Sequence, residues 1–478
     1  MRFLLCNPTY PFIKKRRLPS GPHGSCTQIL FFFFVLFFPF YIQAQTGCPQ
    51  PQIRVYATQQ RWDGFLGSVA DEKNAADANP ATASTFNLLG LLGLGSVRQY
   101  LSFSAPVPAG TTMFVKLTYP SSLFGVGNTV KVQPFVRKNG TETATGPAIT
   151  VGNLISLLNG AGDLEVSVVA RDASNNPVAC DGVWIDFNST LGLALKMQVY
   201  DAYYLKDATP PTGCNVPVDV FSGVRAGALA LANALGWVTD PWKAIDNDSD
   251  TSTYAQLNTG AQILSEVFET ILFNTASRPG DSLYIVMQNS VGGLLNLGLL
   301  SGFQVQPYLG TVAAGPPITT QSSVLNLRLL SGPGNKYVLV VRIPASFDRV
   351  DFQMGGLVDA LSSLRIYDVS VKGPRPKPVL TINGLTGTGP ICINDAGKLK
   401  LSLTPDPCTV YKWYDADKTT LLATGSSFSP VITKEGTYTW YVEAVRNSCN
   451  GDVRNRVPVT VIVLPKPGIP LLTIQLNP

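Results

Sequence analysis

An internal repeat limits the possible folds of this chain more than any other sequence feature. Three motifs of the first half return in the same order in the second: Val132-Gln133-Pro134-Phe135 as Val305-Gln306-Pro307-Tyr308, Gly146-Pro147-Ala148-Ile149-Thr150 as Gly315-Pro316-Pro317-Ile318-Thr319, and Val199-Tyr200-Asp201 as Ile366-Tyr367-Asp368. Self-similarity of this kind marks a duplicated structural unit. We therefore predict two copies of one domain, at 45–207 and 214–373, joined by a linker at 208–213.

Each copy has the residue pattern of an all-β domain. The stretch 349–354 alternates polar and apolar residues, as a strand with one buried face does. The stretch 112–118 reads as a more buried strand. Many such short stretches are separated by turns rich in Gly, Pro and Asn, which favours a β-sandwich or jelly roll. Charged residues make up only 14% of the chain, which suits strands and turns better than solvated helices.

The pattern changes after a Pro-rich linker at 374–378. Residues 379–465 contain short alternating stretches whose spacing predicts a small immunoglobulin-like (Ig-like) sandwich. Residues 466–478 echo the opening of that unit, so we expect a linker or the start of a further unit in a truncated sequence. The predicted fold is therefore all-β: two tandem jelly-roll or β-sandwich domains followed by an Ig-like β-sandwich.

The first 44 residues are predicted to be a secretory signal peptide. Basic residues at 14–17 precede an apolar run at 29–42, and Ala44 offers a small residue before a cut at Gln45. The chain holds 36 basic and 31 acidic residues, and five of the basic ones lie in this segment, so the mature chain is neutral. Neutrality argues against a nucleic-acid partner, because phosphate binding needs clustered positive charge. No later stretch is long and apolar enough to predict a membrane span.

The sequence argues against catalysis. The single histidine, His23, lies in the signal peptide, which removes Ser-His-Asp and Cys-His mechanisms from the mature chain. No Gly-rich loop connects a strand to a helix, so nucleotide binding is not predicted. Neighbouring carboxylates that a glycosidase would need are interpreted as solvated charges: Asp163 and Glu165, and Glu266 and Glu269.

Export would allow the cysteines to form disulfides. Six cysteines follow the signal peptide: Cys48, Cys180, Cys214, Cys392, Cys408 and Cys449. An even number in an oxidising compartment indicates disulfides, in one of several pairings. The bond that we expect is Cys408–Cys449, inside the Ig-like unit. A zinc site is not predicted, because the mature chain has no CxxC pair and no histidine.

One acidic loop occurs in each copy. Both loops read D-x-[DN]-x-x-T: Asp246-Asn247-Asp248-Ser249-Asp250-Thr251 and Asp77-Ala78-Asn79-Pro80-Ala81-Thr82. Oxygen-bearing side chains at this spacing either bind a hard cation or cap a turn through their own backbone. An EF-hand is excluded, because its sixth position is Thr251 rather than Gly and its twelfth is Leu257 rather than Glu.

In its setting this loop resembles that of the discoidin-like, galactose-binding jelly rolls, whose early segment reads roughly A-x-D-G-[DN]-x-x-T. The resemblance implies a structural calcium in each copy. Its ligands would be Asp246, Asp248, Thr251 and Asp368 in the second copy, and Asp77, Asn79, Thr82 and Asp201 in the first. The family glycine adopts a positive φ, which Asn247 tolerates and which we do not expect of Ala78.

Three tryptophans lie just upstream of the two acidic loops, where members of that family place glycan-contacting loops: Trp62, Trp237 and Trp242. The resemblance implies that these rings contact glycan. The alternative is that they pack in the cores of the sandwiches, since buried tryptophan is common there.

The terminal unit resembles the Ig-like modules of secreted surface proteins of Gram-negative gliding bacteria. The matching residues are Ile391-Cys392, Trp413-Tyr414-Asp415, 421–428, Tyr438 and Cys449. Such proteins act as adhesins or stalks. We therefore predict a secreted or cell-surface, non-catalytic, adhesin-like protein of a Gram-negative-type bacterium that binds a glycan or a cell-surface protein. The alternatives are a purely structural stalk or matrix protein, or the glycan-targeting fragment of a larger hydrolase.

Overall fold

The fold is described by a computed structural model. It describes residues 48–88, 95–119, 128–151, 160–189, 194–209, 212–226, 236–246, 252–259, 265–290, 294–295, 300, 302–330, 335–355, 363–387, 389–446, 449, 451 and 455–466. The predicted signal peptide lies outside these residues. Within them, no helix is both long enough and apolar enough to cross a membrane.

The chain divides into two compact units. The larger, here called the tandem unit, comprises Pro49–Pro374 with Ser448–Asn450, and holds both repeats. The smaller, here called the Ig unit, comprises Arg375–Asn447 and Gly451–Pro478 with the N-terminal residues up to Cys48. Nearly all regular structure in the described residues is strand, which confirms the all-β prediction.

Repeat 1 is a β-sandwich in the described residues. One sheet has the order β2-β5-β11-β7-β8, and the other carries β10-β6-β12-β4-β3 with β1 paired to β12. The elements are β1 (Gln52–Tyr56), β2 (Gln59–Phe65), β3 (Gly67–Ala70), the 3-10 helix η1 (Glu72–Ala76), β4 (Ser84–Leu88), β5 (Gly95–Val107), β6 (Thr112–Tyr119), β7 (Asn128–Lys138), β8 (Thr141–Ala144), β9 (Ile149–Thr150), β10 (Gly160–Val169), β11 (Cys180–Ser189) and β12 (Leu195–Asp207). Because side chains alternate along a strand, Val183, Ile185 and Phe187 of β11 enter the core between the sheets.

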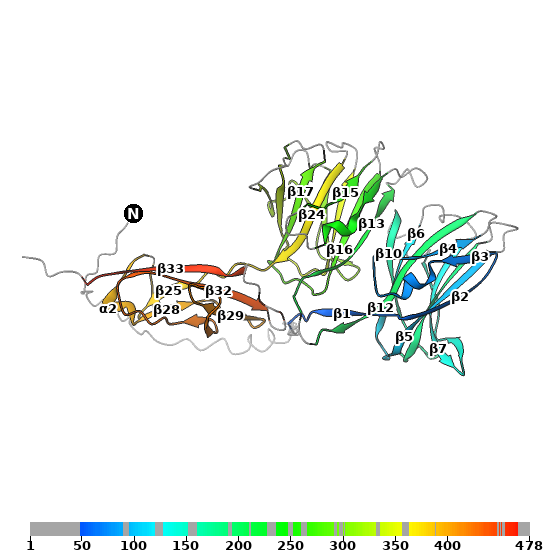
Figure 1. The fold of residues 1–478 in the computed structure, drawn as a ribbon, viewed down its shortest axis with the longest axis horizontal. Coiled ribbons are helices and arrows are strands. Elements are labelled where there is room, and N and C mark those ends of the chain that lie inside the picture. The colour runs from blue at the N-terminus through cyan, green and yellow to red at the C-terminus, as the bar shows by residue number, and fades with distance from the viewer. Residues whose placement is uncertain are drawn as a thin grey trace, which may run out of the picture. The chain divides into compact units, whose positions relative to one another are not determined.

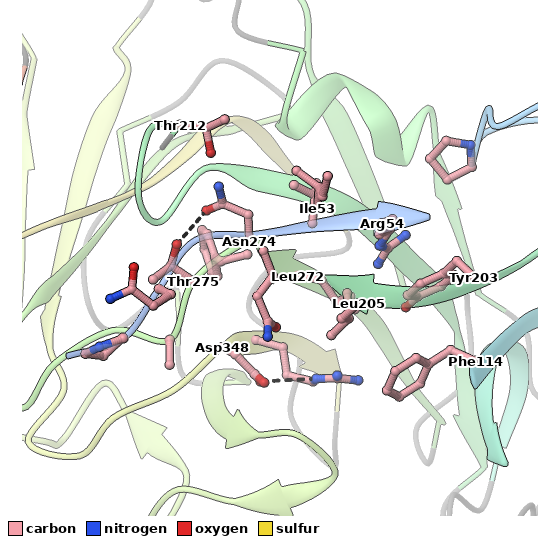
Figure 2. A pocket seen from close by; sticks show the side chains of 18 of the residues that line it. Ile53, Arg54, Phe114, Tyr203, Leu205, Thr212, Leu272, Asn274, Thr275 and Asp348 are labelled. Carbon is pink, nitrogen blue, oxygen red and sulfur yellow. Dashed lines mark hydrogen bonds and ion pairs between the residues drawn. The ribbon is translucent and has the colours of Figure 1, made fainter. Parts of the chain in front are cut away.

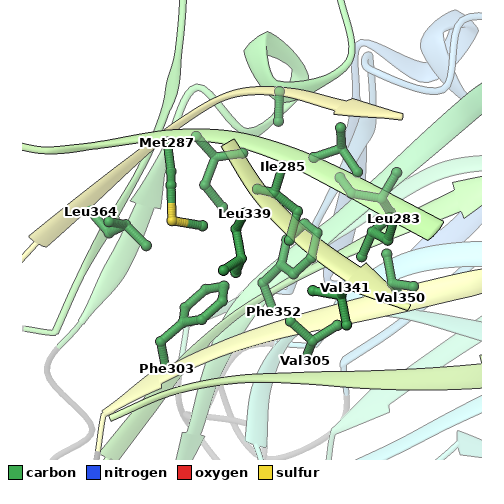
Figure 3. Close-up of a cluster of buried hydrophobic side chains, with 14 of the residues drawn as sticks. Leu283, Ile285, Met287, Phe303, Val305, Leu339, Val341, Val350, Phe352 and Leu364 are labelled. Carbon is green, nitrogen blue, oxygen red and sulfur yellow. The ribbon is translucent and has the colours of Figure 1, made fainter. Parts of the chain in front are cut away.

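Repeat 2 is built in the same way. Its sheets are β19-β18-β23-β16-β13 and β14-β15-β24-β17-β22-β21. The elements are β13 (Pro217–Ala226), β14 (Trp237–Thr239), η3 (Pro241–Ala244), β15 (Ala255–Asn258), β16 (Ser265–Phe273), β17 (Ser282–Asn289), β18 (Phe303–Leu309), β19 (Val312–Ala313), β20 (Ile318–Thr319), β21 (Leu325–Leu329), β22 (Tyr337–Arg342), β23 (Arg349–Gly355) and β24 (Ser363–Lys372). Figure 3 shows the core, where Ile285 and Met287 of β17 meet Phe303 and Phe352 from the facing sheet.

The repeated Gln-Pro motif has the same structural role in both repeats. Gln133 on β7 donates from Nε2 to the carbonyl oxygen of Gly146, at 3.1 Å, and Gln306 on β18 donates to that of Gly315, at 2.9 Å. Both glycines have positive φ. The glutamine therefore ties its strand to the glycine turn that follows, which explains why these two motifs recur together.

The two repeats share a sheet. Strand β10 of repeat 1 pairs with β13 of repeat 2, which joins one sheet from each repeat into a single sheet (Figure 1). Gly162 lies in this ladder with φ +150, and a Cβ added there would lie 2.5 Å from the carbonyl oxygen of Ser222. A second link is the bond from the Gln52 amide to the Asn274 carbonyl oxygen, at 2.7 Å.

The Ig unit is a separate small sandwich. Its sheets are β26-β25-β28-β31 and β27-β33-β32-β29-β30. The elements are β25 (Val379–Ile382), β26 (Leu385–Thr386), β27 (Ile391–Cys392), α2 (Ile393–Ala396), β28 (Leu399–Ser402), β29 (Thr409–Tyr414), β30 (Leu421–Thr424), β31 (Ser427–Phe428), β32 (Gly436–Arg446) and β33 (Val457–Leu464). Trp413 is fully buried at its centre, stacks on Phe428, and donates from Nε1 to the Gly425 carbonyl oxygen at 2.9 Å.

The disulfides differ from the predicted pairing. Cys48 is bonded to Cys408, and Cys214 to Cys449, so the expected Cys408–Cys449 bond is wrong. The β29–β32 ladder ends at the pair Thr409 and Arg446, so Cys408 and Cys449 both lie beyond it and no register holds them opposite each other. Each instead bonds to the cysteine that opens one of the repeats.

Cys180 does not follow the expectation that the mature cysteines pair. It is a free thiol buried in the core of repeat 1, where its Sγ lies 3.5 Å from the sulfur of Met113. Burial raises the pKa of this thiol to about 11. A buried protonated thiol behaves as a small apolar side chain, so Cys180 is a packing residue.

Candidate functional site

The acidic loop of repeat 1 is closed by its own hydrogen bonds. Asp77 accepts from the Asn79 amide at 2.8 Å and from the Thr82 hydroxyl at 2.7 Å. The Asn79 side chain accepts from the Ala81 amide at 3.2 Å. Ala78 adopts a φ of 61, so the expectation that it would avoid the left-handed region is wrong. The loop holds this strained residue because the side chains on either side of it fix the turn.

The residues of the repeat 1 loop do not fit a calcium ion. Calcium takes six to eight oxygen ligands, several of them charged, whereas this loop offers one carboxylate. The loop also has a cation beside it, because the Lys116 ammonium lies 3.1 Å from the Pro80 carbonyl oxygen. Within the part of the chain that the structure describes, no three Asp, Glu, His or Cys side chains are grouped as metal ligands.

The predicted ligands of repeat 2 are only partly described. Asp246 follows η3 and accepts from the Thr253 hydroxyl at 2.6 Å, whereas Asp248 and Thr251 lie outside the described residues. Asp368 lies half-buried within β24, opposite Val286 of β17. Calcium binding by this loop stays a prediction.

Asp201, the proposed late ligand of repeat 1, belongs to another group of residues. It lies on β12 opposite Lys116 of β6, and its carboxylate oxygens are buried without a hydrogen-bond partner among the described residues. Burial, reinforced by the nearby charge of Asp219, raises the pKa of Asp201 to about 7. The neighbouring cations, Arg54 and Lys116, act in the opposite direction but do not cancel these effects.

The three predicted tryptophans have different environments. Trp62 on β2 is 38% exposed, and Trp237 on β14 is 56% exposed. Trp242 in η3 instead packs against the core of repeat 2, and its ring lies 5.0 Å from the Lys116 ammonium. Two of the three indoles are therefore open to a ligand, while the third is occupied by packing.

Lys116 is the central residue of a buried contact between the repeats that sequence reasoning missed. Its side chain is 1% exposed. The ammonium lies 2.7 Å from the Asp219 carboxylate and 3.0 Å from the Val220 carbonyl oxygen, both on β13 of repeat 2. The rings of Tyr200 and Phe221 also lie within 5.1 Å of it. The available signal was a lysine inside the predicted buried strand 112–118.

Further ion pairs extend this contact. Arg54 of β1 also pairs with Asp219, and Arg349 of β23 pairs with Glu165 of β10 at 3.0 Å. Tyr203 donates its hydroxyl to Glu165. Three charged residues of repeat 1 and two of repeat 2 are therefore paired across the contact, which leaves few of these buried charges without a partner.

The carboxylates interpreted as solvated are in fact mostly buried. Asp163 accepts from the Ser222 amide of repeat 2 at 3.1 Å, and burial raises its pKa. Glu165 is held by Arg349 and Tyr203. Glu269 is fully buried in repeat 2, where burial raises its pKa well above the ordinary value. None of the three is placed as a solvent-facing acid and base would be.

A cavity of about 630 Å³ lies between the repeats beside this contact (Figure 2). Repeat 1 contributes one wall from β1, β6, β10 and β12, and repeat 2 contributes the other from β13, β16, the segment after β16, and the start of β23. The exposed tryptophans do not line it. The sequence pattern does not predict this cavity, because the cavity forms only where the two repeats meet.

The Ig unit coincides with a known family. Residues 378–465 match the family model described as "Ig-like domain CHU_C associated". This part of the chain is an Ig-like domain. The match agrees with the two-sheet sandwich around Trp413 and covers no part of the repeats.

No curated protein sequence matches the chain. Among solved structures, it is similar to a fucolectin from striped bass (Morone saxatilis) serum, with 12% identity and a TM-score of 0.21 over 67% of this chain and 98% of that one. It is also similar to a family 32 carbohydrate-binding module of Clostridium perfringens NanJ in complex with galactose, with 12% identity and a TM-score of 0.20 over 32% of this chain and 99% of that one.

Proposed function

We propose that this protein is a non-catalytic, adhesin-like binding protein, exported to the cell surface, whose tandem unit binds glycan. The observation that supports this function most directly is the exposure of Trp62 and Trp237, one in each repeat. Large exposed indoles are uncommon without a binding role, since each adds apolar surface that water must cover.

The surroundings of Trp237 suit a sugar. The Asn258 side chain lies opposite Trp237 and donates to the Trp237 carbonyl oxygen at 3.4 Å. A flat ring edged by donors and acceptors complements the apolar face and the hydroxyl groups of a pyranose.

The buried acids support a non-catalytic role. A glycosidase needs two carboxyl groups facing one cleft with room for the sugar between them. Asp163 and Glu165 are instead committed to the contact between the repeats, and Glu269 is enclosed in a core. The second candidate function is a structural stalk. Two features favour it: the buried ion pairs between the two repeats, and the presence of a terminal Ig-like domain.

A glycan array with the full chain tests the proposal. We expect the wild type to bind, and the double variant Trp62→Ala/Trp237→Ala to lose at least about 90% of the signal, because both stacking platforms are removed. Both indoles are exposed, so the melting temperature should change little.

Phe65→Ala is the matched control, since it removes an exposed aromatic ring from the same strand as Trp62. It should bind as the wild type does. A wild type that is silent across a broad array would favour the stalk, and full binding by the double variant would overturn the role of the two indoles.

A further inference from the structure

The wall that repeat 1 contributes to the inter-repeat cavity contains an apolar patch beside the charged Arg54 and Glu165. Phe114 and Tyr203 lie there with Ile53 and Leu205 (Figure 2), and Tyr56 also lines it. Phe114 and Tyr203 are stacked with centroids 5.3 Å apart, and Tyr56 lies 5.9 Å from Tyr203. Ile53 and Leu205 are 43% and 39% exposed, so the wall is open to solvent at its edge.

The wall that repeat 2 contributes combines apolar residues such as Leu272 and Phe273 with polar side chains that are held in place. Asp348 accepts from the Gly310 amide with both carboxylate oxygens, at 2.9 and 3.0 Å. Arg349 bonds to Glu165 at 3.0 Å and to Asp348 at 3.4 Å. Asn274 accepts from the Thr275 hydroxyl at 3.0 Å. These side chains are therefore preorganised, so ordering them on ligand binding would cost little conformational entropy.

The lining has no excess of charge. Two arginines, Arg54 and Arg349, and two carboxylates, Glu165 and Asp348, line it. Arg349 pairs with both of these carboxylates, and Arg54 pairs with Asp219 behind the lining. A ligand with its own net charge would have to displace one of these partners and leave a buried ion unpaired, at considerable cost. A neutral ligand can instead add hydrogen bonds to the groups already present. The charge balance therefore selects a neutral, polar ligand.

We infer that this cavity binds a neutral saccharide of about one or two sugar rings, in keeping with its size among ligand pockets at domain interfaces. The apolar face of a pyranose would lie on Tyr56, Phe114 and Leu205, with the buried Tyr203 behind them, while its hydroxyl groups would meet Asp348 and Arg349. This inference rests on the proposed function, because it assigns a second glycan site to the same unit. It uses neither of the exposed tryptophans.

Ligand-observed saturation-transfer NMR with the full chain tests this site. The probes are galactose, glucose, fucose and lactose, with glucuronic acid as the charged comparison. We expect transfer to at least one neutral sugar and none to glucuronic acid. Leu205→Trp would fill the mouth of the cavity and should weaken the Kd of the neutral sugar about tenfold or more.

Lys196→Trp is the matched control. It adds the same indole at an exposed position of the same strand, β12, that does not line the cavity. It should change the Kd by less than about twofold. Thermal melts of both variants verify that they fold.

The outcomes separate this inference from the proposed function. Neutral-sugar binding that Trp62→Ala/Trp237→Ala leaves intact and Leu205→Trp abolishes supports the cavity. The inference is overturned by unchanged binding in Leu205→Trp, by preferential binding of glucuronic acid, or by absence of transfer from every neutral sugar. If array binding then persists and depends on the two tryptophans, the proposed function stands without the cavity; if array binding is absent too, both fall.

Discussion

Lys116 joins the two repeats because its ammonium group meets oxygen atoms from both. Pro80 of repeat 1 and Asp219 and Val220 of repeat 2 surround it. Replacing it with methionine keeps most of the side-chain volume but removes the charge that offsets Asp219. We expect Lys116→Met to lower the free energy of unfolding by about 3 kcal/mol, the lower end for breaking a buried pair, because Arg54 still contacts Asp219. Chemical denaturation of the full chain measures this.

The control for this variant is Lys131→Met, which removes the same charge from an exposed position on β7. It should change the free energy of unfolding by no more than about 0.5 kcal/mol. Equal effects of the two substitutions would contradict the role of Lys116.

At the scale of elements, the ladder between β10 and β13 depends on Gly162. Its φ of +150 and its proximity to Ser222 leave no space for a side chain. We expect Gly162→Ala to weaken this ladder, so that amides of β10 and β13 exchange their hydrogens at least about tenfold faster while those of β7 and β11 do not change. Hydrogen exchange followed by mass spectrometry resolves these segments.

Gly140→Ala is the control that separates the effect of backbone strain from the effect of steric overlap with a neighbouring residue. Gly140 also has a positive φ, of +81, but nothing lies within 4 Å of the position of its Cβ. Alanine there adds backbone strain alone, about 1 kcal/mol. If Gly140→Ala accelerated exchange in β10 and β13 as much as Gly162→Ala does, the close approach to Ser222 would not matter.

The elements that could be predicted from the sequence are those marked by a residue pattern within a short stretch of the chain. Alternation identified strands such as 349–354, and the recurring glutamine of Gln133 and Gln306 marked a hydrogen bond that both repeats keep. The β10–β13 ladder that joins the repeats had no such signal, because Gly162 carries no side chain to form a pattern.

The candidate site was predicted less completely, for a related reason. The exposure of Trp62 and Trp237 and the packing of Trp242 depend on neighbours that are distant in sequence. The same holds for the disulfide partners of Cys408 and Cys449, which come from the starts of the two repeats. A residue type and its spacing indicate what a side chain can do, but not which surface is left uncovered.

At the scale of the whole molecule, the buried acids make the stability of the tandem unit depend on pH. Burial raises the pKa of Asp201 to about 7, and also raises those of Asp163, Asp351 and Glu269. The folded chain therefore keeps protons that the unfolded chain has already released. Stability is fully present below the unfolded pKa of such an acid and is lost as the pH rises toward the folded value, by up to about 1.4 kcal/mol per pH unit for each group.

We therefore expect the melting temperature to fall between about pH 4 and pH 7, where the unfolded chain has released the Asp201 proton and the folded chain still holds it. Asp201→Asn keeps the shape of the protonated acid without the titration, so it should reduce the slope over this range and stabilise the protein at neutral pH. The exposed variant Asp63→Asn serves as the control for the substitution itself. Calorimetry at half-unit steps of pH measures all three chains. A melting temperature that rises with pH in the wild type, or an identical slope in Asp201→Asn, would show that the contact between the repeats does not hold Asp201 in its protonated form.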